Sequence, residues 1–263
     1  MTGQRPEVSF LGLKRDRERE KNMKKIAVGL VAAGLAVLGH PALAGDVTGT
    51  ITLKGTPPKE KDITPLKEDA TCGKLYTEMP TTHFYVVGAN GTLADVVVSL
   101  LDADGKPITG KSTGASAPPV VLDQKNCQYS PQIFAVQTGQ KIMVKNSDQV
   151  LHNVHEVPAA DTGNQEQNQA QMPGSPDLPF TIAKPEMFLK FKCDVHPWMF
   201  AWVSVFDNPY FAVSEKDGSY KIANVPPGKY KIQAAHRKAG AVTQDIEVKE
   251  GAPANVDFAL EAK

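Results

Sequence analysis

The sequence predicts an all-β protein built from small β-sandwiches. After residue 44 it contains no long apolar stripe with a period of 3.6 residues. Short runs of alternating apolar residues recur instead, and Gly, Pro, Asn or Asp interrupts them. Alternation with a period of two buries one face of a strand, and frequent turn residues favour a sandwich.

Seven segments before residue 208 have the pattern of strands. They cover residues 47–53, 96–100, 133–136, 142–144, 151–157, 187–191 and 202–206. Residues 158–179, between two of these runs, are rich in Gln and Asn and contain few apolar residues that could join a core. We therefore expect a long surface loop there, which is either disordered or lies over a functional site.

The C-terminal region, residues 208–263, differs from the preceding sequence in its turn motifs and apolar pattern. Asp217-Gly218 is typical of a tight hairpin turn, and Pro227-Gly228 has the order that a type II turn requires, with positive φ at the glycine. The alternating pairs and triplets around these turns predict strands with one buried face. About 56 residues are few for an independent core, so this region is expected to share its apolar face with an earlier segment.

The first 44 residues have the organisation of a secretory signal. Lys24 and Lys25 precede an apolar run over residues 26–38, and Ala42-Leu43-Ala44 matches an A-x-A cleavage site. The run is too short for a permanent membrane anchor. We expect cleavage near Ala44 and a periplasmic or secreted protein. Met23 is the expected start, with residues 1–22 as an upstream extension; the alternative is an unusually long charged signal head.

The charge balance excludes some classes of partner. The 219 residues after the expected cleavage carry 21 Lys and Arg against 25 Asp and Glu, and the lysines are scattered. A chain with this balance has no basic surface for nucleic acid or for anionic lipid.

The motif with the most chemical content is Cys193-x-x-His196-x-x-Met199. A thiolate, an imidazole and a thioether within seven residues suit copper, because a trigonal His2Cys set with a weak axial Met is the ligand set of a blue-copper site. The missing second imidazole is expected from the segment 146–155. Met199 alone would equally be a core residue, since methionine commonly fills cores.

Two histidines in that segment could supply the second imidazole. Successive side chains of a strand point to opposite faces, so His152 and His155 cannot face the same metal without a bulge. His152 stands at the start of the predicted strand, after a segment that contains the polar residues Asn146 and Asp148. We therefore choose His152 as the ligand and expect His155 to face solvent or a hydrogen-bond partner.

Three cysteines in an exported protein permit three disulfide pairings. If Cys193 binds a metal, Cys72 and Cys127 remain to pair with each other, closing a loop of about 56 residues worth roughly 4 kcal/mol in the chain-entropy model. The alternative is that Cys193 belongs to a disulfide and no metal binds.

Several runs between residues 118 and 207 occur in an order that resembles the cupredoxin family. They are Val120-Val121-Leu122-Asp123, Tyr129-Ser130-Pro131, Val136-Gln137-Thr138-Gly139-Gln140, His152-Asn153-Val154-His155 and Cys193-Asp194-Val195-His196-Pro197-Trp198-Met199. The resemblance implies a Greek-key β-sandwich that holds one type 1 copper ion through His152, Cys193, His196 and Met199.

The resemblance also implies roles for neighbouring residues. Asn153 is expected to hold the thiolate through hydrogen bonds, and Pro197 to stiffen the ligand loop. His196 is the implied electron exit, and Trp198 is either an exposed docking rim or ordinary packing. Asp194 departs from the family pattern and is expected to bring an extra carboxylate near copper.

The tail resembles carboxypeptidase regulatory-like β-modules. Such modules open on a strand like Gly45-Asp46-Val47-Thr48-Gly49, and their later turns are similar to those after Asp217. We therefore distinguish residues 45–117, the cupredoxin-like residues 118–207 and residues 208–263. In one arrangement residues 45–112 and 208–263 form one sandwich around an inserted cupredoxin, and Cys72 and Cys127 bridge the two. In the other, residues 45–207 form one enlarged cupredoxin.

The function expected from these residues is one-electron transfer by copper cycling between Cu(I) and Cu(II), with a redox partner protein such as a dehydrogenase or a cytochrome. The alternatives are copper storage or delivery, and a structural β-module with a vestigial site. An enzyme is not expected, because the sequence offers no arrangement of a nucleophile with a base. Multicopper oxidase chemistry would need His-x-His pairs, which the sequence lacks.

Overall fold

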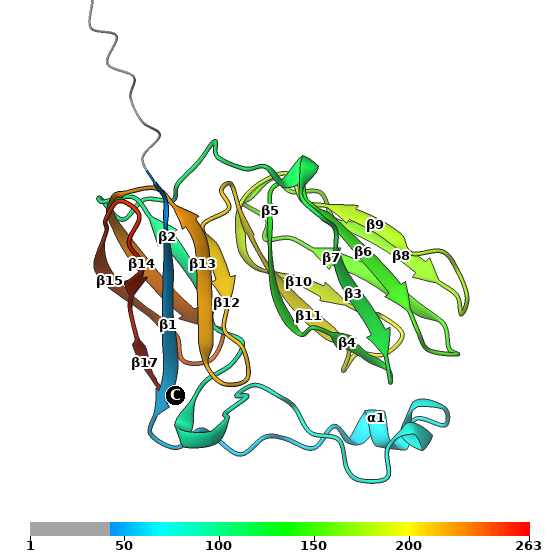
Figure 1. The fold of residues 1–263 in the computed structure, drawn as a ribbon. Coiled ribbons are helices and arrows are strands. Elements are labelled where there is room, and N and C mark those ends of the chain that lie inside the picture. Colours follow the sequence, from blue (N-terminus) through cyan, green and yellow to red (C-terminus); the bar gives the residue numbers. More distant parts are fainter. Residues whose placement is uncertain (1–42) are drawn as a thin grey trace, which may run out of the picture. The chain divides into compact units, whose positions relative to one another are not determined.

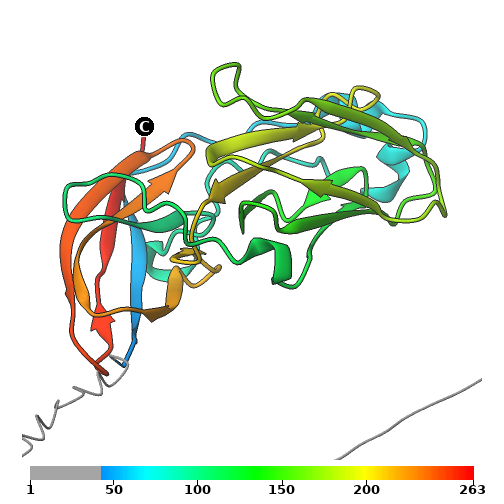
Figure 2. The same ribbon diagram turned by 90° about the horizontal axis from the view of Figure 1, so that it is seen from above.

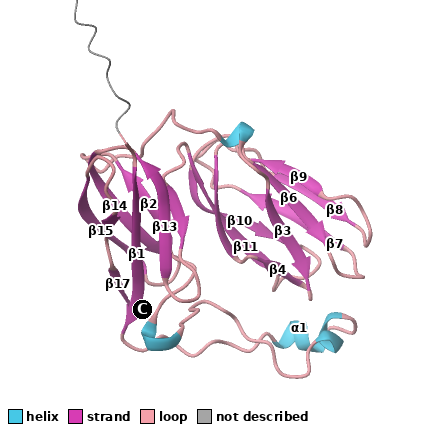
Figure 3. Cartoon of the chain, in the orientation of Figure 1, coloured by secondary structure: helices cyan, strands magenta, loops and turns pink. Residues whose placement is uncertain are grey.

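The computed structural model describes residues 43–263, which are nearly all β (Figures 1 and 3). Residues 1–42, which hold almost the whole expected signal, lie outside this part. No helix within the described residues is long and apolar enough to cross a membrane. Two β-sandwiches, each made of two sheets, confirm the predicted fold class.

The first sandwich, called here the ligand sandwich, is formed by residues 120–206. One sheet contains, in spatial order, β4 (Gln128–Ser130), β3 (Val120–Lys125), β6 (Lys141–Asn146) and β9 (Leu178–Thr181). The other contains β5 (Ile133–Gln137), β11 (Phe200–Phe206), β10 (Glu186–Lys192), β7 (His152–Val157) and β8 (Gln167–Gln171). The pairs β3 with β6 and β5 with β11 are parallel, so the chain crosses between the sheets rather than running only in hairpins.

The second sandwich uses strands from both ends of the described chain. β1 (Gly45–Lys54) pairs with β13 (Ser219–Val225), β16 (Ala254–Asn255) and β17 (Phe258–Glu261). The facing sheet has the order β12 (Phe211–Val213), β2 (Val97–Leu101), β14 (Gly228–His236) and β15 (Gly240–Val248). Residues 45–101 and 211–261 therefore build this sandwich together, and the ligand sandwich lies between them in the sequence.

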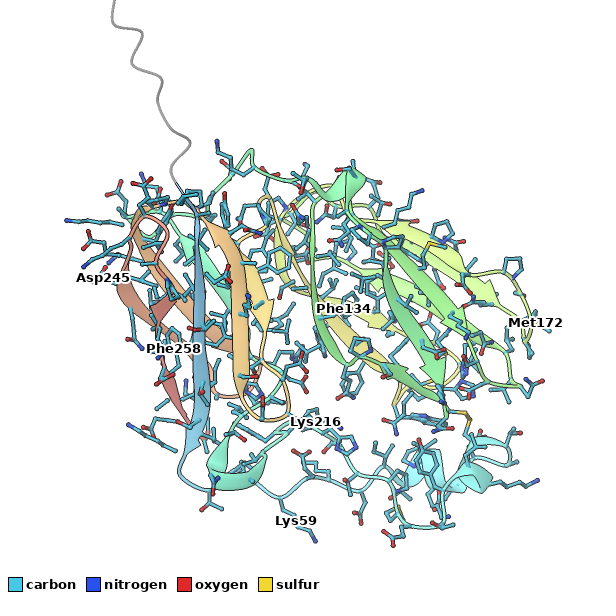
Figure 4. All side chains as sticks on the ribbon, viewed as in Figure 1. Lys59, Phe134, Met172, Lys216, Asp245 and Phe258 are labelled. Atoms are coloured by element: carbon cyan, nitrogen blue, oxygen red, sulfur yellow. A yellow bond between two sulfur atoms is a disulfide. The ribbon has the colours of Figure 1, made fainter. Side chains whose placement is uncertain are left out.

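Each sandwich has its own apolar core, as the alternation of buried and exposed residues along the strands requires. Phe134 belongs to the core of the ligand sandwich and Phe258 to the core of the second one (Figure 4). Cys193 and Met199 are buried within the first of these cores. The candidate ligands are thus embedded in packed structure rather than carried on a mobile surface loop.

The segment between β1 and β2 contributes to both sandwiches. It contains α1 (Thr64–Glu68) and two short 3-10 turns, Cys72–Leu75 and Ala89–Gly91. Leu66 and Cys72 are fully buried in the core of the ligand sandwich, and Cys72 forms a disulfide with Cys127. The predicted pairing of these two cysteines is confirmed, and Cys193 is free.

The prediction of an irregular loop over residues 158–179 is wrong. Residues 167–171 form β8, which pairs along its whole length with β7, and β9 begins at Leu178 and pairs with β6. Both strands lie at the edge of their sheet. An edge strand is held by backbone hydrogen bonds and can expose polar side chains on both faces, so it lacks the apolar alternation from which strands were predicted.

One of the two turn predictions in the tail is also wrong. Gly218 has φ +76°, as the hairpin turn requires, and its N–H donates to the carbonyl of Glu215 over 2.8 Å. Gly228 instead has no positive φ and begins β14, while the left-handed residue near this turn is Asn224, with φ 56°. The turn itself lies at Pro226 and Pro227, between β13 and β14. Asn224 lies inside β13, at the point where the pairing with β1 shifts register as in a β-bulge.

Candidate metal centre

Three of the sequence-predicted ligands converge at one end of the ligand sandwich. His152 is the first residue of β7, Cys193 follows directly after β10, and His196 lies in the loop that leads to β11. The Nδ1 atoms of the two imidazoles lie 3.0 Å apart, and the Cys193 Sγ lies 3.7 Å from the His196 Nδ1. The three side chains are almost completely buried, with exposed fractions of 0, 1 and 7%.

Strand pairing explains why these residues meet. β10 pairs with β7, with Lys192 opposite His155, so the chain that continues from β10 to Cys193 runs beside the start of β7. The loop then turns sharply: the Met199 N–H donates to the His196 carbonyl over 2.8 Å, and the Cys193 N–H donates to the Met199 carbonyl over 3.2 Å. These two bonds close the loop and fix its backbone.

Met199 completes the predicted set of residues at this end. Its side chain is 1% exposed and belongs to the same core as Cys193. A thiol, two imidazoles and a thioether are together a donor set for a soft or borderline metal such as copper. Pro197 stands between His196 and Met199 in the closed loop, where its fixed φ restricts the backbone.

Asn153 holds the thiol from the neighbouring strand. Its backbone N–H points to the Cys193 Sγ over 3.5 Å, and its side-chain Oδ1 accepts a hydrogen bond from the Asp194 N–H over 2.6 Å. Burial opposes ionisation of the thiol, but hydrogen bonds from His152 and from backbone N–H groups lower the pKa of Cys193 below its ordinary value. The surroundings therefore favour the thiolate, which is the form that binds metals.

A carboxylate that the sequence analysis did not assign supports the first imidazole. The Asp148 Oδ2 lies 2.9 Å from the His152 Nε2, and its two oxygens also accept the backbone N–H groups of Asn126 and Cys127, both over 2.7 Å. Donation from Nε2 to this carboxylate leaves the lone pair of Nδ1 directed at the site. The spacing of four residues between Asp148 and His152 was the only signal in the sequence.

The protonation of the two imidazoles differs. Burial opposes a charge on His152, but its bond to Asp148 and the neighbouring Cys193 raise the pKa of this imidazole above its ordinary value. Burial and then the nearby His152 lower the pKa of His196. A neutral His196 is the form that a metal ligand requires.

His155 is excluded from the site, as strand alternation predicts. Its Nδ1 lies 2.8 Å from the Asp194 Oδ2, and its Nε2 lies 2.5 Å from the Glu166 Oε1. Asp194 also pairs with Lys192 over 2.8 Å, and these partners hold the pKa of its carboxyl well below the usual range. Asp194 is paired with His155 and Lys192, and the carboxylate that contacts a candidate ligand is Asp148, behind the ring of His152.

The outer side of the site is covered by the Cys72–Cys127 disulfide and its surroundings. An oxygen of Asp69 and the Cys72 Sγ lie within 4.8 Å of a ring nitrogen of His196, and the Cys127 Sγ lies within the same distance of a ring nitrogen of His152. The edge of His196 is therefore less open than the cupredoxin resemblance implies. Trp198 is half-buried, and its Nε1 donates to the Cys127 carbonyl over 3.0 Å.

The donor atoms fit a single ion. Separations of 3.0 and 3.7 Å between them can be bridged by one metal at ordinary bond lengths of about 2.0–2.3 Å. Two nitrogens and one sulfur would then surround the ion, and Met199 is the predicted fourth ligand.

Comparison with protein families gives one match, in the C-terminal part of the chain. The family model of the carboxypeptidase regulatory-like domain matches residues 197–261, which begin in the ligand loop and include β11 and the C-terminal strands of the second sandwich. This match covers about a quarter of the sequence. Comparison with curated proteins gives no match.

Solved structures similar to this chain are copper proteins of low sequence identity. A reduced Cu(I) form of an amicyanin variant is 20% identical, with a TM-score of 0.30, and the alignment covers 41% of this chain and 97% of amicyanin. A purple cupredoxin from Nitrosopumilus maritimus is 18% identical, with a TM-score of 0.28, over 34% of this chain and 99% of that protein.

A copper-containing nitrite reductase from Thermus scotoductus SA-01 is 19% identical, with a TM-score of 0.30, over 40% of this chain. This chain spans only 27% of that reductase. All of these scores are low. The case for a metal centre therefore comes from the side chains themselves.

Proposed function

We propose that this protein is a copper-binding electron carrier. His152, Cys193 and His196 would hold one copper ion, with Met199 as a fourth ligand, and the ion would supply one-electron transfer between Cu(I) and Cu(II). The observation that carries the proposal is the convergence of two imidazole Nδ1 atoms and one thiol, within 4.8 Å of one another, in a buried site. The copper ion supplies the redox chemistry.

The chain's own residues suit this role because they resist rearrangement. Asp148 fixes the ring of His152, Asn153 fixes the sulfur, and two backbone hydrogen bonds close the ligand loop. Cu(I) and Cu(II) prefer different geometries. A frame that changes little between them lowers the reorganisation that each electron transfer requires.

The compartment and the partner are part of the proposal. A disulfide between Cys72 and Cys127 fits an oxidising compartment such as the periplasm, which agrees with the secretory signal expected in the sequence. The partner is a second redox protein that exchanges electrons at the copper end of the ligand sandwich. No substrate is transformed in this role.

The direct experiment is a visible and EPR spectrum after copper loading. An intense visible band from the thiolate to Cu(II), bleached by a reductant and restored by an oxidant, supports the proposal. Cys193→Ser should abolish the band, because no other free thiol exists in the described chain. His155→Gln is the matched control: it removes an imidazole three residues from His152 and should leave the band intact. An unchanged spectrum in Cys193→Ser would discard the assignment.

Copper storage or delivery is a second candidate function. The burial of all three ligands and the covered edge of His196 favour it, since slow exchange suits storage. The same spectrum separates the two functions. Tight binding of Cu(I) together with a colourless or labile Cu(II) form would favour storage, whereas a reversible blue or purple chromophore favours electron transfer.

A further inference from the structure

The residues 63–76, called here the cap, cover the end of the ligand sandwich at which His196 lies. Leu66 and Cys72 of the cap are fully buried in the core of that sandwich, and Ile63 and Tyr76 pack against it. An Asp69 oxygen and the Cys72 sulfur lie within 4.8 Å of a ring nitrogen of His196. Figures 1 and 2 show the cap, in cyan around α1, beside the strands of the ligand sandwich from two directions.

Besides its disulfide and the burial of Leu66, the cap is held to the ligand sandwich by few hydrogen bonds. α1 has five residues, and a helix of this length is not stable without tertiary support. Within the described residues, no strand pairs with the cap, and the side-chain hydrogen bonds that join it to the ligand sandwich are both made by Tyr76. Its hydroxyl donates to the Asn126 carbonyl and accepts from the Gln128 Nε2, each over 2.7 Å.

The other half of the disulfide is attached to the supports of the candidate ligands. The Cys127 N–H donates to Asp148, which holds His152. The Cys127 carbonyl accepts from Trp198, whose ring centroid lies 5.2 Å from that of His196. A bond between Cys72 and Cys127 therefore ties the cap to the part of the sandwich that carries both imidazoles.

We propose that the Cys72–Cys127 disulfide is a redox latch that closes the cap over His196. With two free thiols the cap opens locally and His196 becomes accessible to copper and to small solutes; with the disulfide formed, the cap stays closed. Closure forms the Cys72–Cys127 sulfur–sulfur bond while an exported protein disulfide, acting as the oxidant, accepts two electrons and two protons and becomes a dithiol. The consequence for copper entry rests on the proposed function.

The latch itself can be tested without metal on the full chain. Diethyl pyrocarbonate modifies accessible neutral imidazoles, and peptide mass spectrometry reports each histidine separately. In the oxidised protein His196 should react at least tenfold more slowly than the exposed His83. After reduction by a water-soluble phosphine its rate should rise at least tenfold. The double variant Cys72→Ser with Cys127→Ser should show the fast rate with and without reductant.

Buried His236, in the second sandwich, is the internal control for unfolding. It should stay protected in every case, because only the cap opens. Equal rates at His196 before and after reduction would overturn the latch, and so would a simultaneous rise at His236. If the double variant does not fold, the reaction rates of His196 in the oxidised and the reduced wild-type protein decide whether the disulfide closes the cap.

Copper transfer to a chromogenic Cu(I) chelator then tests the consequence. The reduced protein should lose Cu(I) at least tenfold faster than the oxidised protein. If neither form binds copper, the proposed function fails while the histidine reactivity still decides on the latch. If copper binds and leaves both forms at the same rate, the latch does not control the metal and that part of the proposal is overturned.

Discussion

At the scale of single residues, the candidate site depends on side chains that hold the ligands as much as on the ligands. Asp148 is one of them: it accepts the Nε2 proton of His152 and is itself held by the N–H groups of Asn126 and Cys127. A carboxylate behind a ligand imidazole fixes the tautomer and strengthens the metal bond. The backbone N–H of Asn153 points at the sulfur of Cys193 and helps to hold it in place.

Asp148→Asn should therefore weaken copper binding by about 10- to 100-fold, the usual effect of removing such a support. The measurement is a titration of copper against a competing chelator. Asp177→Asn, an exposed aspartate of the same sandwich, is the control and should bind copper like the wild type. An affinity unchanged in Asp148→Asn would show that His152 is not held in this way, or is not a ligand.

The sequence predicted the candidate ligands but not this support. Cys193, His196 and Met199 lie within seven residues, so their spacing alone reveals them, and strand alternation separates His152 from His155. Asp148 lies in the approach to β7, where no periodicity predicts the direction of a side chain. Its role depends on the β3–β4 turn, which supplies the two N–H groups that orient it.

At the scale of elements, edge strands and short helices were the parts that the sequence did not reveal. Only Gln171 of β8 is buried, and its side chain bonds to polar groups rather than joining an apolar core; the other Gln and Asn side chains are half-buried or exposed. α1 begins next to Pro65 and has too few residues for a helical period. The inner strands β10 and β11 carry alternating buried residues and were predicted within a few residues.

Gln171→Ala should destabilise the protein by roughly 1–3 kcal/mol, because it leaves buried polar partners unpaired. The Gln171 Nε2 donates to the Val144 and Pro176 carbonyls, and its Oε1 accepts from Gln124 over 2.6 Å. Urea denaturation of the metal-free protein measures the change. Gln169→Ala, at a half-buried position of the same strand, is the control and should change the stability little.

β7 also carries a buried carboxyl with an unusual titration. Burial, and then the nearby Glu186, raise the pKa of Glu156 to about 7. Between the ordinary value and about pH 7 the folded protein thus binds more protons than the unfolded chain, so this group's contribution to stability is present at low pH and lost as the pH rises through 7. The loss amounts to at most about 3 kcal/mol.

Glu156→Gln should remove this part of the pH dependence. The free energy of unfolding of the metal-free protein is measured in urea at pH 5 and at pH 8. The wild type should lose more stability between the two values than the variant. The same loss in both proteins would show that Glu156 is not protonated in the folded state near neutral pH.

At the scale of the whole molecule, the second sandwich needs both ends of the described chain. β1 takes β13, β16 and β17 as partners, and β2 lies between β12 and β14. A fragment of residues 208–263 lacks β1 and β2 and should not fold alone, whereas a mixture with a chain of residues 45–207 should regain protected amides. Hydrogen exchange measures this. An independently folded C-terminal fragment would contradict the shared sandwich.

The central claim is that two imidazoles and one thiolate bind a single copper ion. X-ray absorption at the copper edge of the loaded, intact protein tests it most directly, because the fine structure counts sulfur and imidazole neighbours. We expect one short sulfur neighbour and two imidazole nitrogens, with the sulfur lost in Cys193→Ser. A copper ion surrounded only by oxygen and nitrogen in the unsubstituted protein would contradict it.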